Sequence, residues 1–138
     1  MTVGEPLLRI ELPGAPVFRR GKVRDTFDLG DQLLMVSSDR VSAFDVIMPN
    51  GIPGKGTILT QLSNFWFART RGIVRNHLLA TDPAEFPASV RPYAELLRGR
   101  SVLVRKAQRV DIECVVRGYL AGSAWVEYQR AGTVCGQP

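Results

Sequence analysis

The sequence is poor in histidine and cysteine, and this removes two kinds of chemistry from consideration. His77 is the only histidine among 138 residues, which excludes a metal site built from several histidines, and we expect it to be structural. The two cysteines, Cys114 and Cys135, give no disulfide framework. Both are expected to be reduced thiols, which is typical of a cytoplasmic protein.

Long apolar stretches are missing as well. No run of 18 apolar residues occurs, so the sequence predicts no membrane span and no membrane partner. The first residues lack the basic start and the apolar stretch of a signal peptide, which again favours a cytoplasmic location. The length suits one domain, or one lobe and the start of another.

Positive charge is in excess, with 18 basic and 13 acidic residues and a net charge of +5. Such a balance favours an anionic partner without choosing among nucleic acid, nucleotide and membrane. Four basic residues cluster around a glycine without interleaved aromatic residues: Arg19, Arg20, Lys22 and Arg24. This pattern fits a small phosphorylated ligand better than a long polymer, so we expect no nucleic-acid partner.

The region around this cluster is expected to form an antiparallel meander. Residues 17–18, 23–28 and 33–36 have the β-branched and apolar composition of short strands. Glycine-containing turns separate these strands, at residues 20–22 and 29–31. The meander therefore has a glycine loop at one end.

The glycine loop has a composition that suits phosphate. Gly21 would allow the backbone to approach a phosphate closely. Lys22 and Arg24 are two residues apart and share one face of a strand, so both could point toward a polyphosphate. The loop is not a Walker motif, because no Gly-x-x-x-x-Gly-Lys-Thr sequence is present. A solvated edge strand with ordinary basic residues is the alternative.

Residues 37–49 follow an apolar strand and are dense in acids and hydroxyls, which indicates a loop of the kind that often carries function. Asp39 and Asp45 could bind an amine or orient Arg40. The alternative is a solvent-exposed loop with local Asx and Ser turns. A second turn-rich segment, residues 52–56, contains Lys55 as a candidate ligand for an anionic group.

An amphipathic helix is predicted for residues 57–70. Its large apolar side chains recur at helical spacing and are expected to face the core: Ile58, Leu59, Leu62, Phe65 and Trp66. Further on, residues 92–98 are expected to form a short helix that ends at Gly99, and residues 102–105 another strand.

The last part of the chain is expected to run from a strand at residues 112–116, through a glycine-containing turn, into a helix that starts at Ser123 and ends near Gly132. Ser123 suits a helix N-cap. Arg117, this hydroxyl and the helix N-terminus together suit a phosphate or carboxylate ligand. A surface arginine beside an ordinary N-cap is the alternative.

Three ordered blocks of this sequence resemble the SAICAR synthetase family (phosphoribosylaminoimidazole-succinocarboxamide synthase). The resemblance extends from about Val17 to Gly136. The blocks are GKVRD at residues 21–25; SDRVSAFD, IPGKG and SNFWF between residues 38 and 67; and ECVVRGYLAGS, followed by AWVEY, at residues 113–128.

The resemblance implies an α+β fold, with an antiparallel sheet and flanking helices in a kinase-like ATP-binding lobe. Residues 1–108 would form this lobe. Residues 109–138 would form a hinge and the start of a truncated second, substrate-binding lobe. Residues 107–111 resemble an adenine-binding hinge, although Asp111 stands where the family usually has proline.

The family's reaction joins L-aspartate to the carboxylate of carboxyaminoimidazole ribonucleotide (CAIR), with ATP and magnesium, in de novo purine biosynthesis. By the match, four residues would bind ATP: Gly21, Lys22, Val23 and Arg24. Seven others are substrate candidates: Asp39, Arg40, Ser42, Asp45 and Lys55 in the first lobe, and Arg117 and Ser123 for the CAIR 5′-phosphate.

No magnesium ligands are identified in this chain. The family's metal-binding block, Asp-x-Lys-x-Glu-Phe-Gly, would follow Pro138, so the 138 residues alone are not expected to make SAICAR at a normal rate. If the chain did so, Asp39, Asp45 or Glu113 would have to carry the metal. A homo-oligomer, or assembly with a missing C-terminal portion, is compatible with the sequence.

Two other functions remain open from the sequence. One is a truncated, non-catalytic lobe that binds a nucleotide, and the other is a basic nucleic-acid-binding module. The nucleic-acid-binding module would be favoured if the chain bound a nucleic acid with an affinity that ATP does not change and that falls steeply with salt.

Overall fold

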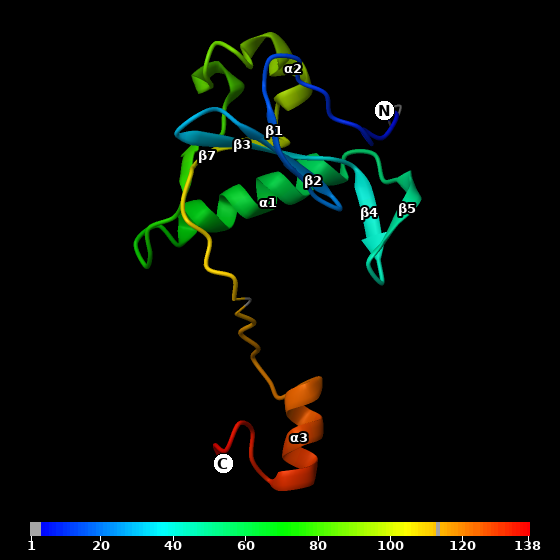
Figure 1. The fold of residues 1–138 in the computed structure, drawn as a ribbon, viewed down its shortest axis with the longest axis vertical. Coiled ribbons are helices and arrows are strands. Elements are labelled where there is room, and N and C mark those ends of the chain that lie inside the picture. The colour runs from blue at the N-terminus through cyan, green and yellow to red at the C-terminus, as the bar shows by residue number, and fades with distance from the viewer. Residues whose placement is uncertain (1–3, 113) are drawn as a thin grey trace. The chain divides into compact units, whose positions relative to one another are not determined.

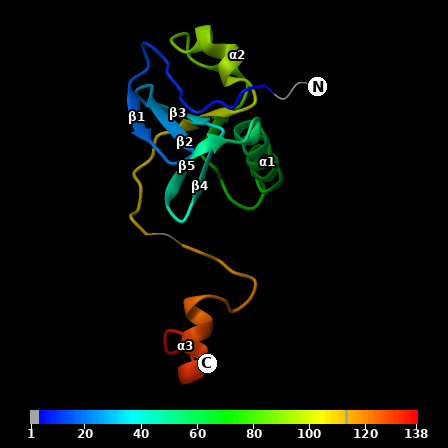
Figure 2. The same ribbon diagram turned by 90° about the vertical axis from the view of Figure 1, so that its right-hand side faces the viewer.

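The computed structural model describes residues 4–112 and 114–138. The chain divides into two units, Met1–Ala107 and Gln108–Pro138, which are described separately. The first unit contains a five-stranded antiparallel sheet, and Figures 1 and 2 place the helices α1 (Lys55–Arg69) and α2 (Ala94–Leu97) on opposite sides of it. The predicted α+β class and its antiparallel sheet are confirmed.

The sheet has the strand order β1-β2-β3-β7-β6. Its strands are β1 (Val17–Arg20), β2 (Arg24–Asp28), β3 (Gln32–Ser37), β7 (Ser101–Arg105) and β6 (Leu78–Ala80). The first three form the predicted meander, and β7 lies beside β3 with Leu34 opposite Leu103. Alternation along β3 buries Leu34 and Val36 on one face of the sheet and turns Met35 toward the other.

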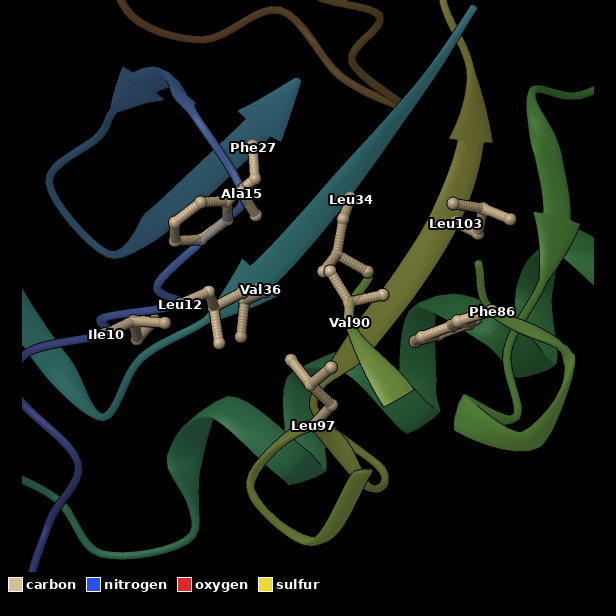
Figure 3. Close-up of a cluster of buried hydrophobic side chains, with 10 residues drawn as sticks. All are labelled: Ile10, Leu12, Ala15, Phe27, Leu34, Val36, Phe86, Val90, Leu97 and Leu103. Carbon is tan, nitrogen blue, oxygen red and sulfur yellow. The ribbon is translucent and has the colours of Figure 1, made fainter. Parts of the chain in front are cut away.

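The hydrophobic core lies on the face of the sheet opposite α1. An irregular N-terminal segment and the short helices η1 (Pro83–Glu85), η2 (Arg91–Tyr93) and α2 cover this face. Ten buried side chains form the cluster in Figure 3: Ile10, Leu12, Ala15, Phe27, Leu34, Val36, Phe86, Val90, Leu97 and Leu103. The short helix predicted for residues 92–98 corresponds to η2 and α2.

Helix α1 packs on the sheet through its small and polar residues. Only Gly56 and Thr60 of this helix are buried. A Cβ atom on Gly56 would lie 2.5 Å from the Ser37 carbonyl oxygen, so the helix can approach the sheet this closely only with glycine there. The Thr60 hydroxyl donates a hydrogen bond of 3.0 Å to the Ser37 hydroxyl.

The prediction that the apolar side of this helix faces the core is wrong. All five of its large side chains are between 48% and 66% exposed: Ile58, Leu59, Leu62, Phe65 and Trp66. Helical spacing identifies an apolar face but not the neighbour that covers it. In this fold the face of α1 that carries Gly56 and Thr60 contacts the sheet, because glycine allows a closer approach.

The sequence predicted a loop for residues 37–49, and this prediction is wrong. Instead β4 (Arg40–Ala43) and β5 (Val46–Gly51) form an antiparallel hairpin that constitutes a second, two-stranded sheet. Its two-residue turn consists of Phe44 (φ 48°) and Asp45 (φ 67°). Positive φ at both central residues matches the right-handed twist of a hairpin, although Asn-Gly is the usual sequence. The polar composition of this segment therefore predicted a loop where the chain forms a pair of strands.

The second unit contains α3 (Ser123–Ala131), which confirms the predicted helix and its end near Gly132. The strand predicted for residues 112–116 is absent from residue 112 and residues 114–116, which are irregular and exposed. Glu113 lies outside the described residues. β-branched residues favour an extended chain, but a strand also needs a partner, and residues 108–112 and 114–138 provide none for this segment.

Across the parts of the chain that the structure describes, no helix is both long and apolar enough to cross a membrane.

Asp39 joins three segments of the first unit. Its side chain is 1% exposed. One carboxylate oxygen accepts the Leu7 amide at 2.9 Å, and the other accepts the Gly56 amide at 2.8 Å and Arg100 at 3.2 Å. Burial raises the pKa of Asp39, but these hydrogen bonds and the charge of Arg100 outweigh it, so the pKa lies below its usual value.

The packing of α1 predicts different costs for two Leu→Ala substitutions. Leu97→Ala, in the core, should lower the free energy of unfolding by about 2–5 kcal/mol because it leaves a cavity. Leu62→Ala removes a side chain that is 53% exposed and should cost less than about 1 kcal/mol. Urea unfolding followed by circular dichroism measures both. Equal losses would show that Leu62 is buried in solution.

The charge of Asp39 predicts a specific dependence of stability on pH. Because folding lowers its pKa, its stabilisation is fully present above the unfolded-state value of about 3.9 and is lost as the pH falls through the folded-state value. Asp39→Asn should therefore reduce stability at neutral pH and flatten the decline in acid. Urea unfolding from pH 7 to pH 3 tests this, with Asp31→Asn, an exposed acid, as the control. Parallel pH profiles for Asp39→Asn and the unsubstituted chain would contradict the assignment.

Candidate functional site

The loop between β1 and β2, residues 21–23, has all three carbonyl groups hydrogen-bonded, while two of its amide groups have no partner in the described part of the chain. We call it the glycine loop. A Cβ atom on Gly21 would lie 2.6 Å from the Arg24 carbonyl oxygen, so glycine is required, and the Gly21 amide donates to that oxygen at 2.8 Å. The amides of Lys22 and Val23 have no hydrogen-bond partner among residues 4–112 and 114–138. Free backbone amides beside a lysine suit an anion.

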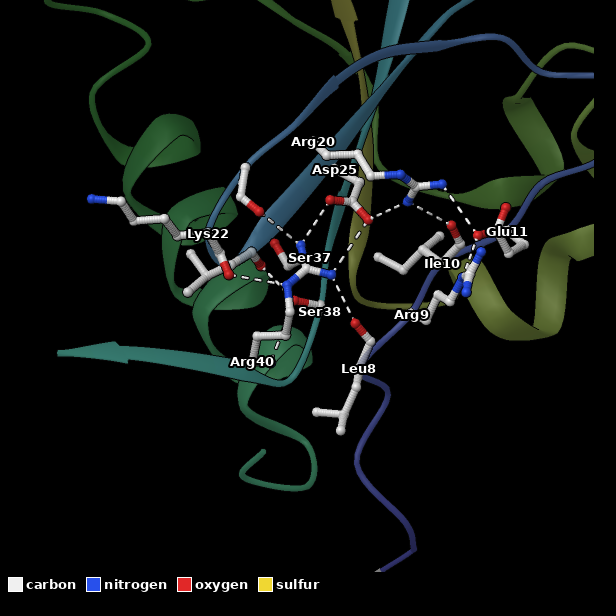
Figure 4. A network of polar contacts seen from close by, with 12 residues as sticks. Leu8, Arg9, Ile10, Glu11, Arg20, Lys22, Asp25, Ser37, Ser38 and Arg40 are labelled. Atoms are coloured by element: carbon white, nitrogen blue, oxygen red, sulfur yellow. Dashed lines mark hydrogen bonds and ion pairs between the residues drawn. The ribbon is translucent and has the colours of Figure 1, made fainter. Parts of the chain in front are cut away.

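Arg40 bonds the carbonyl side of this loop (Figure 4). Its Nε donates to the Lys22 carbonyl at 3.0 Å, and its Nη2 donates to the Gly21 carbonyl at 3.0 Å. The remaining loop carbonyl, that of Val23, accepts the Ser38 amide at 3.0 Å and the Ser38 hydroxyl at 2.8 Å. Residues 38 and 40 thus fix the orientation of the whole loop.

A buried ion pair lies directly behind the loop. The Asp25 side chain has no exposed surface and accepts Arg40 Nη2 at 2.7 Å and Arg20 Nη1 at 2.9 Å. Asp25 was not predicted as a site residue from the sequence. The available signal was its position two residues before Phe27 in β2, which places an acid on the buried face of a strand.

The four substrate candidates from residues 37–49 are not brought together in one place. Asp39 is buried in the contacts described above, and Arg40 is engaged by the glycine loop and Asp25. Ser42 lies in β4 opposite Ile47. Asp45, at the hairpin turn, is 91% exposed and lies 2.5 Å from the Lys22 ammonium. This hydrogen bond and the charge of Lys22 lower the pKa of Asp45.

A cleft of about 520 Å³ lies between the sheet and α1, whose lining residues run from Lys55 to Phe67. Three residues expected to bind ligands line it, namely Val23, Arg24 and Lys55. Its apolar walls include Met35, Leu59, Phe67, Leu78 and Val102. An apolar cleft with charged groups at one end has the character of a small-molecule site.

Two further cleft residues were not assigned a ligand role from the sequence. The buried side-chain oxygen of Asn64 has no hydrogen-bond partner in the described part of the chain, so it can accept a bond from a ligand or water. His77 stacks edge-to-face with Phe67 at 5.1 Å. Partial burial and then the charge of Arg24 lower the pKa of His77, which favours the neutral imidazole.

Lys55 opens α1 at the edge of this cleft. The preceding Gly54 has φ 78° and provides no side-chain cap, and the first turn carries no acidic residue. A lysine at a helix N-terminus opposes the helix dipole, so an anionic ligand would be favoured by both charges.

In the second unit, Arg117 lines a shallow hollow of about 440 Å³ together with Val115, Tyr119 and Ala124. Ser123 is the first residue of α3 and not its N-cap, because the cap position is Gly122 and no side-chain cap bond forms. The expectation of a serine cap was therefore wrong. Within residues 108–112 and 114–138, no hydrogen bond joins Arg117 to Ser123.

The acids do not assemble a magnesium site in the described residues. No group of three or more His, Cys, Asp or Glu side chains there is placed to hold a metal ion. Asp39 is occupied by protein donors, and Asp45 pairs with Lys22. The residues present therefore do not fit this ion.

This chain is similar to known proteins of one family. A family model described as SAICAR synthetase matches residues 17–137. A phosphoribosylaminoimidazole-succinocarboxamide synthase of Pelobacter propionicus is 54% identical over 134 residues, which are 97% of this chain and 45% of that protein. The corresponding protein of Desulfosudis oleivorans is 59% identical over 126 residues, or 91% of this chain and 43% of that one.

The solved structures agree with the sequence comparisons. A SAICAR synthase superposes with a TM-score of 0.82 and 44% identity, over 95% of this chain and 47% of the other. The SAICAR synthase of Saccharomyces cerevisiae in complex with SAICAR gives a TM-score of 0.79 over the same shares. The chain thus spans a little under half the length of the relatives it matches. This chain belongs to the SAICAR synthetase family.

Proposed function

We propose that this chain is the ATP-binding portion of an enzyme that joins L-aspartate to CAIR, giving SAICAR, ADP and phosphate in de novo purine biosynthesis. The observation that carries the proposal is the glycine loop. Its three carbonyl groups are bonded inside the protein, while the amides of Lys22 and Val23 have no partner among the described residues. Similarity along almost the whole chain to SAICAR synthases supports the choice of reaction.

In this proposal the phosphates of ATP lie at the glycine loop and the adenine lies in the cleft. Gly21, Lys22, Val23 and Arg24 are the ATP-binding residues. The apolar walls formed by Met35 and Val102 suit a purine ring, while Lys22 and Arg24 offset the charge of the phosphates. Residues 1–108 would then be the ATP-binding lobe, and residues 109–138 the hinge and the start of a substrate-binding lobe.

The reaction requires charge stabilisation more than acid–base chemistry. A CAIR carboxylate oxygen attacks the γ-phosphorus of ATP, ADP leaves, and an acyl phosphate forms. The aspartate amine then attacks the acyl carbon and forms the C–N bond. The C–O bond breaks, phosphate leaves with its electron pair, and the nitrogen loses a proton to solvent. Lys22, Arg24 and Lys55 supply positive charge for the first step, and Arg117 and Ser123 hold the CAIR 5′-phosphate.

The β4–β5 hairpin carries two further candidates for substrate binding. Ser42 and Asp45, on the β4–β5 hairpin, remain candidates for contact with CAIR or aspartate. No step is assigned to magnesium here, because the described acids do not fit it. The small-molecule substrates and the absence of a spanning helix among the described residues are consistent with our proposal of a cytoplasmic enzyme.

A second candidate is a nucleotide-binding lobe that is not catalytic by itself. One observation favours it: no cluster of metal-binding acids is found in the described residues. ATP binding without SAICAR formation by the 138-residue chain would distinguish it from the complete enzyme.

The two proposed anion sites predict opposite effects on two ligands. In the intact enzyme of which we propose this chain is a part, Arg117→Ala removes a charge-assisted hydrogen bond worth about 1.5–3 kcal/mol. CAIR affinity should then fall about tenfold to a hundredfold, with little change for ATP. Lys22→Ala should lower the affinity for ATP about tenfold or more and should change the affinity for CAIR by less than about twofold. Isothermal titration with each ligand measures all four values.

Arg98→Ala is the control, because this arginine is 64% exposed and pairs only with Glu95 in the described part of the chain. It should leave both affinities unchanged. Equal weakening of ATP and CAIR by either Lys22→Ala or Arg117→Ala would contradict the assignment of separate sites.

A further inference from the structure

Arg40 has no donor left for a ligand. A guanidinium carries five N–H donors. In this structure Arg40 makes five hydrogen bonds: to the carbonyls of Leu8, Gly21 and Lys22, and to both oxygens of Asp25. Its side chain is only 14% exposed. A substrate could reach the guanidinium only by breaking contacts that are already made.

The charge of Arg40 is also neutralised within the protein. Asp25 has no exposed surface and lies between Arg40 and Arg20, at 2.7 and 2.9 Å. A buried carboxylate is retained only when it is paired and hydrogen-bonded. Both the geometry and the electrostatics of Arg40 are thus directed inward, toward the glycine loop.

The contacts of Arg40 determine which groups of the glycine loop remain available. The carbonyls of Gly21 and Lys22 are bonded to its guanidinium, whereas the amides of Lys22 and Val23 are unbonded in the described residues. Carbonyl oxygens repel a phosphate and amide groups attract it. Without Arg40, the loop carbonyls would be free to turn toward a phosphate.

Asp39, the neighbour of Arg40, performs a similar task on a different segment. Its carboxylate accepts the amide of Gly56, the residue that follows Lys55, at 2.8 Å. Consecutive side chains therefore hold the two segments that carry Lys22 and Lys55. We call this pair the Asp39–Arg40 brace.

We propose that Arg40 is a positioning residue that acts on phosphate binding through the glycine loop and Lys22, without touching substrate. This inference rests on the proposed ATP site and adds to it. It replaces the role of substrate ligand that the family resemblance implied for Arg40.

Arg40→Lys separates charge from geometry. Lysine keeps the positive charge, but its single ammonium cannot bond two loop carbonyls and a carboxylate in the planar arrangement of a guanidinium. The substitution should loosen the loop while leaving the sheet intact. The matched control is Arg19→Lys in β1, since the Arg19 side chain makes no hydrogen bond in the part of the chain that the structure describes.

The first readout is amide hydrogen exchange of the 138-residue chain. In Arg40→Lys, exchange at Gly21 should accelerate by about tenfold or more, because its bond to the Arg24 carbonyl depends on the shape of the loop. Exchange at Leu34, in the centre of the sheet, should change little and reports the integrity of the fold. Unchanged exchange at Gly21 would overturn the proposal.

The second readout is a double-mutant cycle on ATP affinity with Lys22→Ala. Arg40→Lys alone should lower the affinity for ATP about tenfold. In a chain that already carries Lys22→Ala, the same substitution should lower that affinity by less than about twofold. An equal loss in both backgrounds would mean that Arg40 acts on ATP independently of Lys22, which would overturn the proposal. If the unsubstituted chain binds no ATP, the proposed ATP site fails, and the exchange measurement alone decides the role of Arg40.

A second variant covers the case in which Arg40→Lys does not fold. Asp25→Asn combined with Arg40→Gln removes both buried charges together, so it leaves neither one unpaired. It should also accelerate exchange at Gly21 relative to Leu34. Protection of Gly21 equal to that in the unsubstituted chain would count against the brace.

Discussion

The buried ion pair between Asp25 and Arg40 is the interaction on which the candidate site depends. A carboxylate without exposed surface would be strongly destabilising if it were unpaired, so the arginine must remain in place. Once there, its other donors meet the carbonyls of the glycine loop and of the N-terminal segment. One desolvated charge thereby fixes the backbone at the proposed phosphate site.

A second constraint acts at α1. Its N-terminal end lies so close to the sheet that Gly56 cannot carry a side chain, and the Asp39 carboxylate holds its amide there. This contact places Lys55 at the cleft and leaves the large apolar side chains of the helix on the exposed side. Exposed apolar residues in such a row mark a surface that another protein segment can cover.

Local sequence features predicted much of this fold. Alternation in residues 23–28 and the apolar run at residues 33–36 predicted the meander. Glycine followed by lysine predicted the loop, whose ligand class remains a prediction. The glycine after Ala131 gave the end of α3. Each of these depends on neighbours along the chain. Residues 112–116 show the limit of that reasoning, because their β-branched side chains predicted a strand for which the described residues of the second unit provide no partner.

The failures in the candidate site share a physical cause. Asp39 and Arg40 were predicted as substrate ligands from a segment dense in acids and hydroxyls and from the family resemblance. Their partners in the fold include Leu7, Gly56 and Gly21, which the local pattern does not connect to them. Asp25 was overlooked for the same reason. Whether a charged side chain is a ligand or a structural support depends on burial and on long-range partners, which only the folded chain reveals.

The most direct test of the account is the location of bound ATP on the 138-residue chain, measured by titration of its amide NMR spectrum. The account predicts that the largest shifts fall on the amides of Lys22 and Val23, with further shifts at the cleft residues Met35 and Val102. Shifts confined to residues 108–138, or spread evenly over the exposed basic residues, would contradict it.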